Sequence, residues 1–344
     1  MSEMKPIERI RAVCKGELPD RVPFVPASRE FGMKYAGFPL SKAYEDPDCY
    51  IDAQIRLVEE FGQDAVWDIW ATPVVDEALG ATLVFPEDDS PFIGSDHFLK
   101  NIEDWDSVKR VNPLKDGRMP YMISLVEKLK KRVGPDVPVI AWISQPFRTA
   151  CMLHGEAELY RDLLKKPGDV LHLIERVYDS LLDYGKALID AGADIICTSN
   201  PVANAECISK RAYAKFSHPF TERIFGDLKS YGNVLTWFHT CGRWNDRFDL
   251  VTEENVDVLH LDKVDLAEFK ASFSDKAVAC GNLRTSEVLL HGSAEDARQE
   301  TINCINSAKE GGRFILGANC AVPRDTPAEN MRAVVSALNE FGYY

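Results

Sequence analysis

Val137–Ser144 reads VPVIAWIS, a run of apolar residues that ends in a serine and is followed by a segment of helical period. The same pair, an apolar run and then a helical segment, recurs along the chain. Most of the runs are continuous rather than alternating, which is typical of parallel strands buried on both faces. The other runs are Val22–Pro26, Ala65–Trp70, Asp194–Ser199, Val234–His239, Val256–Asp262, Ala277–Gly281 and Arg313–Gly317.

Eight such runs alternating with helices favour an α/β protein that folds as one closed (β/α)8 barrel of the TIM type. An open doubly wound sheet is the alternative that the same alternation permits. No stretch resembles a linker, so we expect a single domain over residues 1–344. The amphipathic start of the chain predicts a helical extension before the barrel. The long interval between Val84 and Asp136, with its acidic turn Glu87–Pro91, predicts a small insertion after the second strand.

The overall composition excludes several classes of partner. The chain of 344 residues contains 54 acidic and 40 basic residues, which gives a formal net charge of −14. An acidic surface repels nucleic acid and anionic lipid. No apolar run approaches the ~20 residues of a membrane span, and no signal-peptide core is present. The nine cysteines are an odd number, which favours reduced thiols in the cytoplasm over a disulfide framework.

In a parallel barrel, catalytic and binding groups lie at the carboxyl ends of the strands. The side chains that follow or end the eight runs are therefore candidates for the functional site. They are Arg29, Glu30, Asp68, Gln145, Arg148, Ser199, Asn200, His239, Cys241, Asp262, Cys280, Asn282, Asn319 and Cys320.

Three of these side chains, His239, Cys241 and Cys320, are ligands that zinc prefers. A His-x-Cys pair at the tip of one strand can reach a single ion if the chain bends, and Gly242 permits that bend. Three protein ligands leave a fourth position for substrate or water, as in catalytic zinc sites. The alternative is that these cysteines are small buried hydrophobic residues. Cys280 is a candidate fourth ligand or an inert neighbour.

Asp68 is a carboxylate inside an apolar run, which is costly unless the group is paired or functional. It is a candidate catalytic residue, either as a general acid or as an acceptor for substrate N–H groups. The alternative is an interior salt bridge to an arginine such as Arg29 or Arg148.

Several tryptophans lie in or near the strands, and one or two are expected to form an apolar wall for a flat ligand. Together with the strand-end amides they supply the candidate substrate-binding residues. These are Trp70, Gln145, Asn200, Trp237 and Asn282.

Motifs along nearly the whole chain resemble the uroporphyrinogen decarboxylase family. Pro19–Pro23 is similar to the opening of its first strand, and Asp68-Ile69 with Glu77–Gly80 to its second strand and loop. Gly281–Leu283 and the stretch Gly311–Val334 are similar to its seventh strand and C-terminal signature. The resemblance implies a single (β/α)8 barrel.

That family has two branches. The decarboxylases carry an arginine-rich segment that grips a polycarboxylate substrate, whereas Ala27–Lys34 here keeps one arginine. The corrinoid-dependent methyltransferases carry His-x-Cys after the fifth strand and a cysteine after the eighth, and these bind zinc. His239, Cys241 and Cys320 match that pattern.

The resemblance therefore implies a zinc-dependent methyltransferase. It would exchange a methyl group between a small substrate, such as a thiol or a methoxy or methylamine donor, and the cobalt of a separate corrinoid protein that carries methylcobalamin. Two alternatives stay open. One is a tetrapyrrole decarboxylase that uses Asp68, and the other is a non-enzymatic barrel that binds a corrinoid or tetrapyrrole.

Overall fold

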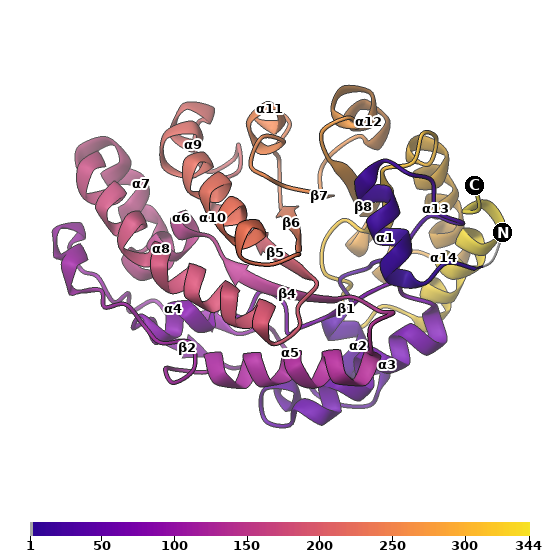
Figure 1. Ribbon diagram of the computed structural model, residues 1–344, viewed down its shortest axis with the longest axis horizontal. Helices are drawn as coiled ribbons and strands as arrows, with labels where there is room; N and C mark the ends of the chain where they lie inside the picture. Colours follow the sequence, from indigo (N-terminus) through magenta and orange to yellow (C-terminus); the bar gives the residue numbers. More distant parts are fainter. Residues whose placement is uncertain (1–2) are drawn as a thin grey trace.

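Seven parallel strands form one curled sheet in the computed structural model, which describes residues 3–344 (Figure 1). Their order in the sheet is β1-β4-β5-β6-β7-β8-β9, so each strand lies beside the next parallel strand along the chain. The mixed α/β fold with a curled parallel sheet is as predicted, and it is TIM-type. The strands are β1 (Val66–Trp67), β4 (Val139–Ser144), β5 (Ile195–Ser199), β6 (Leu235–Thr240), β7 (Val258–Leu261), β8 (Val278–Leu283) and β9 (Phe314–Ala318).

The first predicted strand, Val22–Pro26, is less regular than expected. Phe24 and Ala27 form isolated parallel bridges with Leu316 and Ala321, beside β9. On its other side, the Phe24 carbonyl accepts a hydrogen bond of 2.8 Å from the Asp64 N–H, just before β1. The segment thus lies between the two edges of the sheet. Its two prolines lack the N–H that a regular ladder requires, which explains why only bridges form.

Helices surround the strands on the outside (Figure 1). Pro167 is the first residue of α8 and separates this helix from α7. The α-helices are α1 (Pro6–Lys15), α2 (Arg29–Tyr35), α3 (Pro47–Phe61), α4 (Val74–Ala78), α5 (Met119–Val133), α6 (Pro146–His154), α7 (Glu156–Lys165), α8 (Pro167–Asp190), α9 (Lys210–Phe216), α10 (His218–Tyr231), α11 (Phe248–Val251), α12 (Leu266–Phe273), α13 (Ala294–Ala308) and α14 (Ala328–Phe341). Short 3-10 turns are η1 (Leu40–Tyr44), η2 (Ile102–Ser107) and η3 (Pro201–Ala203), and η4 (Thr285–Leu290) is π-helical.

The interior of the curled sheet is closed at the amino ends of the strands by α1. Ile10 and Val13 of this helix belong to the same buried cluster as Ile195 and Val258, the first residues of β5 and β7. The cluster continues through the interior toward the carboxyl ends of the strands, as far as Trp70. The carboxyl ends of the strands therefore lie on the side of the sheet away from α1.

The interval between β1 and β4 contains a small hairpin in addition to helices. After α4 the chain forms an antiparallel hairpin, β2 (Leu83–Val84) and β3 (Phe92–Ile93), before η2 and α5. The Ser90 hydroxyl in the hairpin loop donates a hydrogen bond of 2.9 Å to Glu30. The hairpin is thereby attached to the carboxyl-end side of the barrel.

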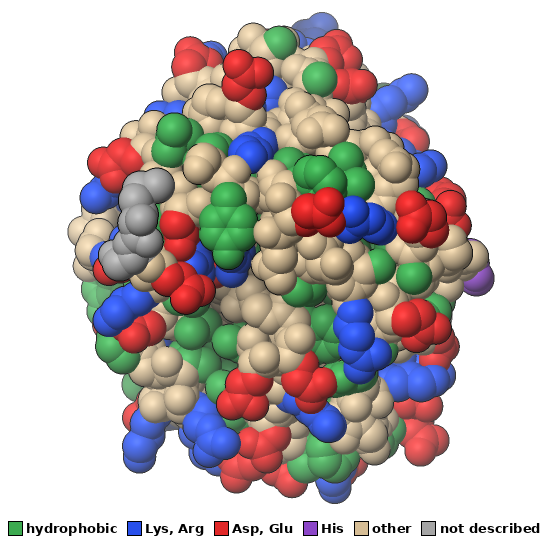
Figure 2. Space-filling view, turned by 90° about the vertical axis from the view of Figure 1, so that its right-hand side faces the viewer, with side chains coloured by type: hydrophobic (Ala, Val, Ile, Leu, Met, Phe, Trp, Pro, Cys, Tyr) green, Lys and Arg blue, Asp and Glu red, His purple; other side chains and the backbone are tan. Residues whose placement is uncertain are grey.

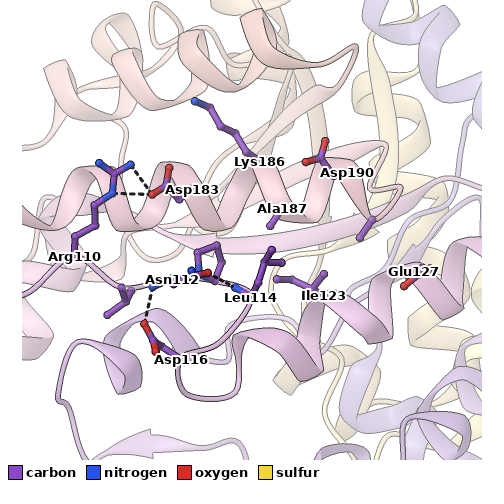
Figure 3. Close-up of a pocket in the computed structure, with 13 residues that line it drawn as sticks. Arg110, Asn112, Leu114, Asp116, Ile123, Glu127, Asp183, Lys186, Ala187 and Asp190 are labelled. Atoms are coloured by element: carbon purple, nitrogen blue, oxygen red, sulfur yellow. Dashed lines mark hydrogen bonds and ion pairs between the residues drawn. The ribbon is translucent and has the colours of Figure 1, made fainter.

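The outer surface mixes charges of both signs. Figure 2 shows Asp and Glu side chains interspersed with Lys and Arg over one face. A groove of about 860 Å³ lies on the outside of the barrel, between α5 and α8 (Figure 3). Arg110 at its edge pairs with Asp183 at 2.6 Å. None of the candidate site residues lines this groove. Among the described residues, none of the helices has the length and apolar character needed to cross a bilayer.

Candidate metal centre

The structure brings His239, Cys241 and Cys320 together. One ligand atom from each of the three lies within 4.8 Å of the others. His239 is near the end of β6, Cys241 directly follows that strand, and Cys320 follows β9. The bend after Cys241 occurs at Gly242, whose φ of 86° is in the left-handed region that glycine adopts readily. Strands distant in sequence thus supply one cluster at the carboxyl ends of the sheet.

The donor set fits a zinc ion. With Zn–N of ~2.05 Å and Zn–S of ~2.3 Å, tetrahedral coordination separates nitrogen and sulfur by about 3.6 Å. The distance from Cys320 Sγ to His239 Nε2 is 3.6 Å. Interaction with the neighbouring Cys320 thiol lowers the pKa of the Cys241 thiol, and the same interaction raises the pKa of Cys320. Cys241 is therefore the thiol of the pair that is more readily ionised.

Cys280 lies outside this group. The predicted seventh strand ended at Gly281, but β8 continues to Leu283, so Cys280 is inside the strand rather than at its tip. Its side chain belongs to the fully buried interior cluster. Burial raises the pKa of its thiol well above the ordinary value. This setting is that of a packing residue.

Hydrogen bonds fix the two chain segments that carry the thiols. The Asp262 carboxylate accepts one hydrogen bond from the Gly242 N–H at 2.8 Å and another from Asn319 Nδ2 at 2.7 Å. The Cys241 carbonyl accepts a further bond of 2.9 Å from the Trp244 indole N–H. Asp262 was visible in the sequence as a strand-end residue, but its contacts with both segments depend on the fold.

Asp68 is completely buried, immediately after β1. One carboxyl oxygen accepts a hydrogen bond of 2.8 Å from the Trp142 N–H, and the other has no partner among the described residues. Burial raises its pKa to about 7, and the hydrogen bond from Trp142 and the charge of Arg29 only partly offset this. The alternative, an interior salt bridge to Arg29 or Arg148, is not formed among the described residues. Arg29 instead hydrogen-bonds Glu30, Ser90 and the Trp70 carbonyl, and Arg148 donates to the Ser144 hydroxyl at 3.0 Å.

The two candidate tryptophans have different surroundings. The Trp70 ring lies edge-on to the His239 ring, with centroids 5.2 Å apart. Trp237 is deeper, between Trp67 and His260 in the interior cluster. Of the two, Trp70 is therefore next to the cluster of His239, Cys241 and Cys320, while Trp237 packs beneath it.

The three candidate amides also divide. Asn200 donates a hydrogen bond of 2.7 Å to Gln145, and both side chains are buried. Asn282 is half-buried and donates to the carbonyls of Asp262 and Val264. It lines a cavity of about 340 Å³ that also includes Asn319, the neighbour of Cys320. Of the three, Asn282 lies in a cavity beside the cluster.

The fold and the cluster together define the class of protein. It is a TIM-type barrel with a candidate metal centre, one imidazole and two thiols, at the carboxyl ends of its strands. The uroporphyrinogen decarboxylase (URO-D) family matches residues 5–341, almost the whole chain. The chain belongs to this family, and the resemblance expected from its motifs is confirmed.

Relatives from both branches of the family match this chain. Methylcobamide:CoM methyltransferase MtaA of Methanosarcina barkeri is 25% identical over 348 residues and 99% of each chain is covered. A uroporphyrinogen decarboxylase of Psychromonas ingrahamii is 24% identical over 360 residues, which covers 99% of this chain and 98% of that protein. A solved structure of a methyltransferase from Methanosarcina mazei has a TM-score of 0.88 at 23% identity, covering 98% of this chain and 99% of that chain. This structural likeness supports the fold.

Proposed function

We propose that the protein is a methyltransferase that exchanges a methyl group between a small substrate and the cobalt of a separate corrinoid protein. The observation that carries the proposal is the convergence of His239, Cys241 and Cys320 in a barrel of this family. The similarity to a methylcobamide:CoM methyltransferase supports the methyl acceptor or donor being a small thiol or a related compound. We further propose that residues 1–344 form one domain, a (β/α)8 barrel whose first strand is Val22–Pro26 and whose insertion lies between β1 and β4.

The three side chains would hold zinc, and Cys280 would not take part. Bound zinc supplies a Lewis acid that lowers the pKa of a coordinated thiol or polarises a methylated donor. Trp70 would form an apolar wall beside the site, and Asn282 would line the adjoining cavity. In the direction toward a thiol acceptor, the substrate thiol would release its proton to solvent, and its sulfur would form a bond to the methyl carbon. The methyl–cobalt(III) bond of the partner's corrinoid would break, and its electron pair would stay on cobalt as cobalt(I).

The test uses the purified protein with free methylcobalamin in place of the partner protein. We expect bound zinc close to one equivalent, together with thiol-dependent loss of the methylcobalamin absorption spectrum and formation of a methyl thioether. Full transfer activity in protein that contains no metal would overturn the proposal. Cys151→Ala is a matched control, because this buried thiol lies on α6, outside the cluster.

A second candidate function, tetrapyrrole decarboxylation, is favoured by one observation. Asp68 is buried with a pKa raised to about 7, so it can be neutral or ionised near neutral pH. A second observation speaks against this alternative. The Arg29 guanidinium is paired with the Glu30 carboxylate and also bonds Ser90 and the Trp70 carbonyl, so little of its positive charge is left for a polycarboxylate substrate. Release of carbon dioxide from uroporphyrinogen by metal-free protein would support this alternative.

A further inference from the structure

We propose that Asp262 is a positioning residue that clamps the two thiol-bearing segments of the metal centre in register. This inference rests on the proposed function, because it concerns how the chain holds that metal. Asp262 follows β7, which lies between β6 and β8 in the sheet. It does not belong to the cluster of potential ligands itself.

The clamp consists of two hydrogen bonds that meet on one carboxylate. Oδ2 of Asp262 accepts from the Gly242 N–H at 2.8 Å, one residue beyond Cys241. Oδ1 accepts from Asn319 Nδ2 at 2.7 Å, one residue before Cys320. Each thiol-bearing residue is therefore adjacent in sequence to a residue that Asp262 holds.

The side-chain amide of Asn319 is also held at its oxygen end. Its Oδ1 accepts a hydrogen bond of 3.0 Å from the Thr285 N–H at the start of η4, and its own N–H donates to the Leu283 carbonyl at 2.8 Å. The amide therefore cannot turn to present its oxygen elsewhere without losing the Thr285 bond. The orientation of Asn319 Nδ2 toward Asp262 is fixed by the backbone after β8.

A carboxylate is the side chain that this position requires. It can accept from both donors at once, whereas the amide of asparagine offers one accepting oxygen and places an N–H₂ group against the other donor. Outer-shell partners that orient ligands typically contribute about 10- to 100-fold to metal affinity. We therefore expect Asp262→Asn to weaken zinc binding by about 10- to 100-fold.

The experiment measures zinc affinity of the full-length protein by competition with a chromophoric chelator. Asp257→Asn is the matched control. Asp257 is also a half-buried carboxylate that accepts a backbone N–H, from Thr236 at 2.8 Å, but at the other end of the sheet. It should change thermal stability without changing zinc affinity. Cobalt(II) absorption of the variants adds a readout of ligand geometry, which a general loss of stability does not alter.

Asn319→Ala tests the hydrogen bond apart from the negative charge of Asp262. It removes the bond from Asn319 Nδ2 and keeps the carboxylate. We expect it to weaken zinc binding as well, by about tenfold. The double variant Asp262→Asn/Asn319→Ala should lose little more zinc affinity than Asp262→Asn alone, because both hydrogen bonds meet on the Asp262 carboxylate. If Asp262→Asn does not fold, Asn319→Ala decides the question.

Zinc affinity within threefold of wild type in Asn319→Ala would overturn the clamp, whatever the effect of Asp262→Asn. Equal losses in Asp262→Asn and Asp257→Asn would also overturn it, since the effect would then be one of general stability. A wild-type protein that binds no zinc would refute the metal centre of the proposed function instead, so the two failures are distinguishable.

Discussion

Asp68 provides a test of the energetic reasoning, because the structure buries its carboxyl group without a cation. The pKa of this group is raised from 3.8 to about 7 by burial. Below the lower value the group is protonated in both the folded and the unfolded chain. Between the two values only the folded chain holds the proton, so stability is lost as the pH rises. The loss is complete above pH ~7.

The size of the effect follows from the separation of the two pKa values. Each pH unit corresponds to about 1.4 kcal/mol, so a separation of about three units corresponds to about 4 kcal/mol. Asp68→Asn removes this titration. Its amide can still accept from the Trp142 N–H, but the new N–H₂ group lacks an acceptor, at a pH-independent cost of about 1–3 kcal/mol. The variant should be less stable than wild type at pH 4 and more stable at pH 8.

The assay is urea unfolding of both proteins at several pH values between 4 and 8, followed by tryptophan fluorescence. Only the difference between the two proteins is interpreted, because the other carboxyl groups titrate in both. A difference in the free energy of unfolding that stays constant over this range would refute the reasoning from burial.

Asp64 is the matched control for this experiment. It is as buried as Asp68, but it accepts hydrogen bonds from Arg9 at 2.9 Å and Arg21 at 2.8 Å. Asp64→Asn leaves the buried Arg21 guanidinium without its anion, whereas Arg9 keeps its ion pair with Asp20 at 2.7 Å. We therefore expect a loss of about 3–5 kcal/mol at pH 8. Two substitutions of the same type should thus have opposite effects on stability at this pH.

Two further predictions concern the metal cluster and the closure of the sheet. Cys320→Ser should abolish bound zinc and methyl transfer, while Cys280→Ala should retain both. Elemental analysis measures the bound zinc. Loss of zinc in Cys280→Ala would contradict the proposal that Cys280 is not a ligand. In Gly317→Ala the added Cβ would lie 3.0 Å from both Cys280 Sγ and the Val25 carbonyl, so we expect about 1–3 kcal/mol of destabilisation in urea unfolding. Gly168→Ala, where a Cβ meets no atom within 4 Å, should cost nothing, and equal stability of the two variants would argue against the close approach of Val25 to β9.

The sequence supported most of the fold because the parallel strands are continuous apolar runs. VPVIAWIS predicted a strand to Ser144, and β4 ends at that residue. The first run was overestimated, because Pro23 and Pro26 interrupt its hydrogen bonding although they leave the apolar pattern intact. The second was overestimated too: beyond Trp67 the chain turns, with the Trp70 N–H bonded to the Asp68 carbonyl.

The site was predictable to the extent that it depends on which residues follow the strands. His239, Cys241 and Cys320 were identified in this way, and they do converge. Cys280 was misplaced because an error of two residues at the end of β8 moves a side chain from the rim to the interior. The role of Asp262 depends on the relative positions of three loops, which no pattern in a single segment encodes.

The bridges between the Val22–Ala27 segment and the residues in and after β9 have a consequence for the order of events during synthesis. His239 and Cys320 are 81 residues apart, and Cys320 follows the last strand of the sheet. A growing chain therefore contains only part of the cluster until Cys320 has left the ribosome. The complete centre then depends on the segment after β9 packing against Val22–Ala27, so occupancy of the centre would mark a chain in which these two segments have met.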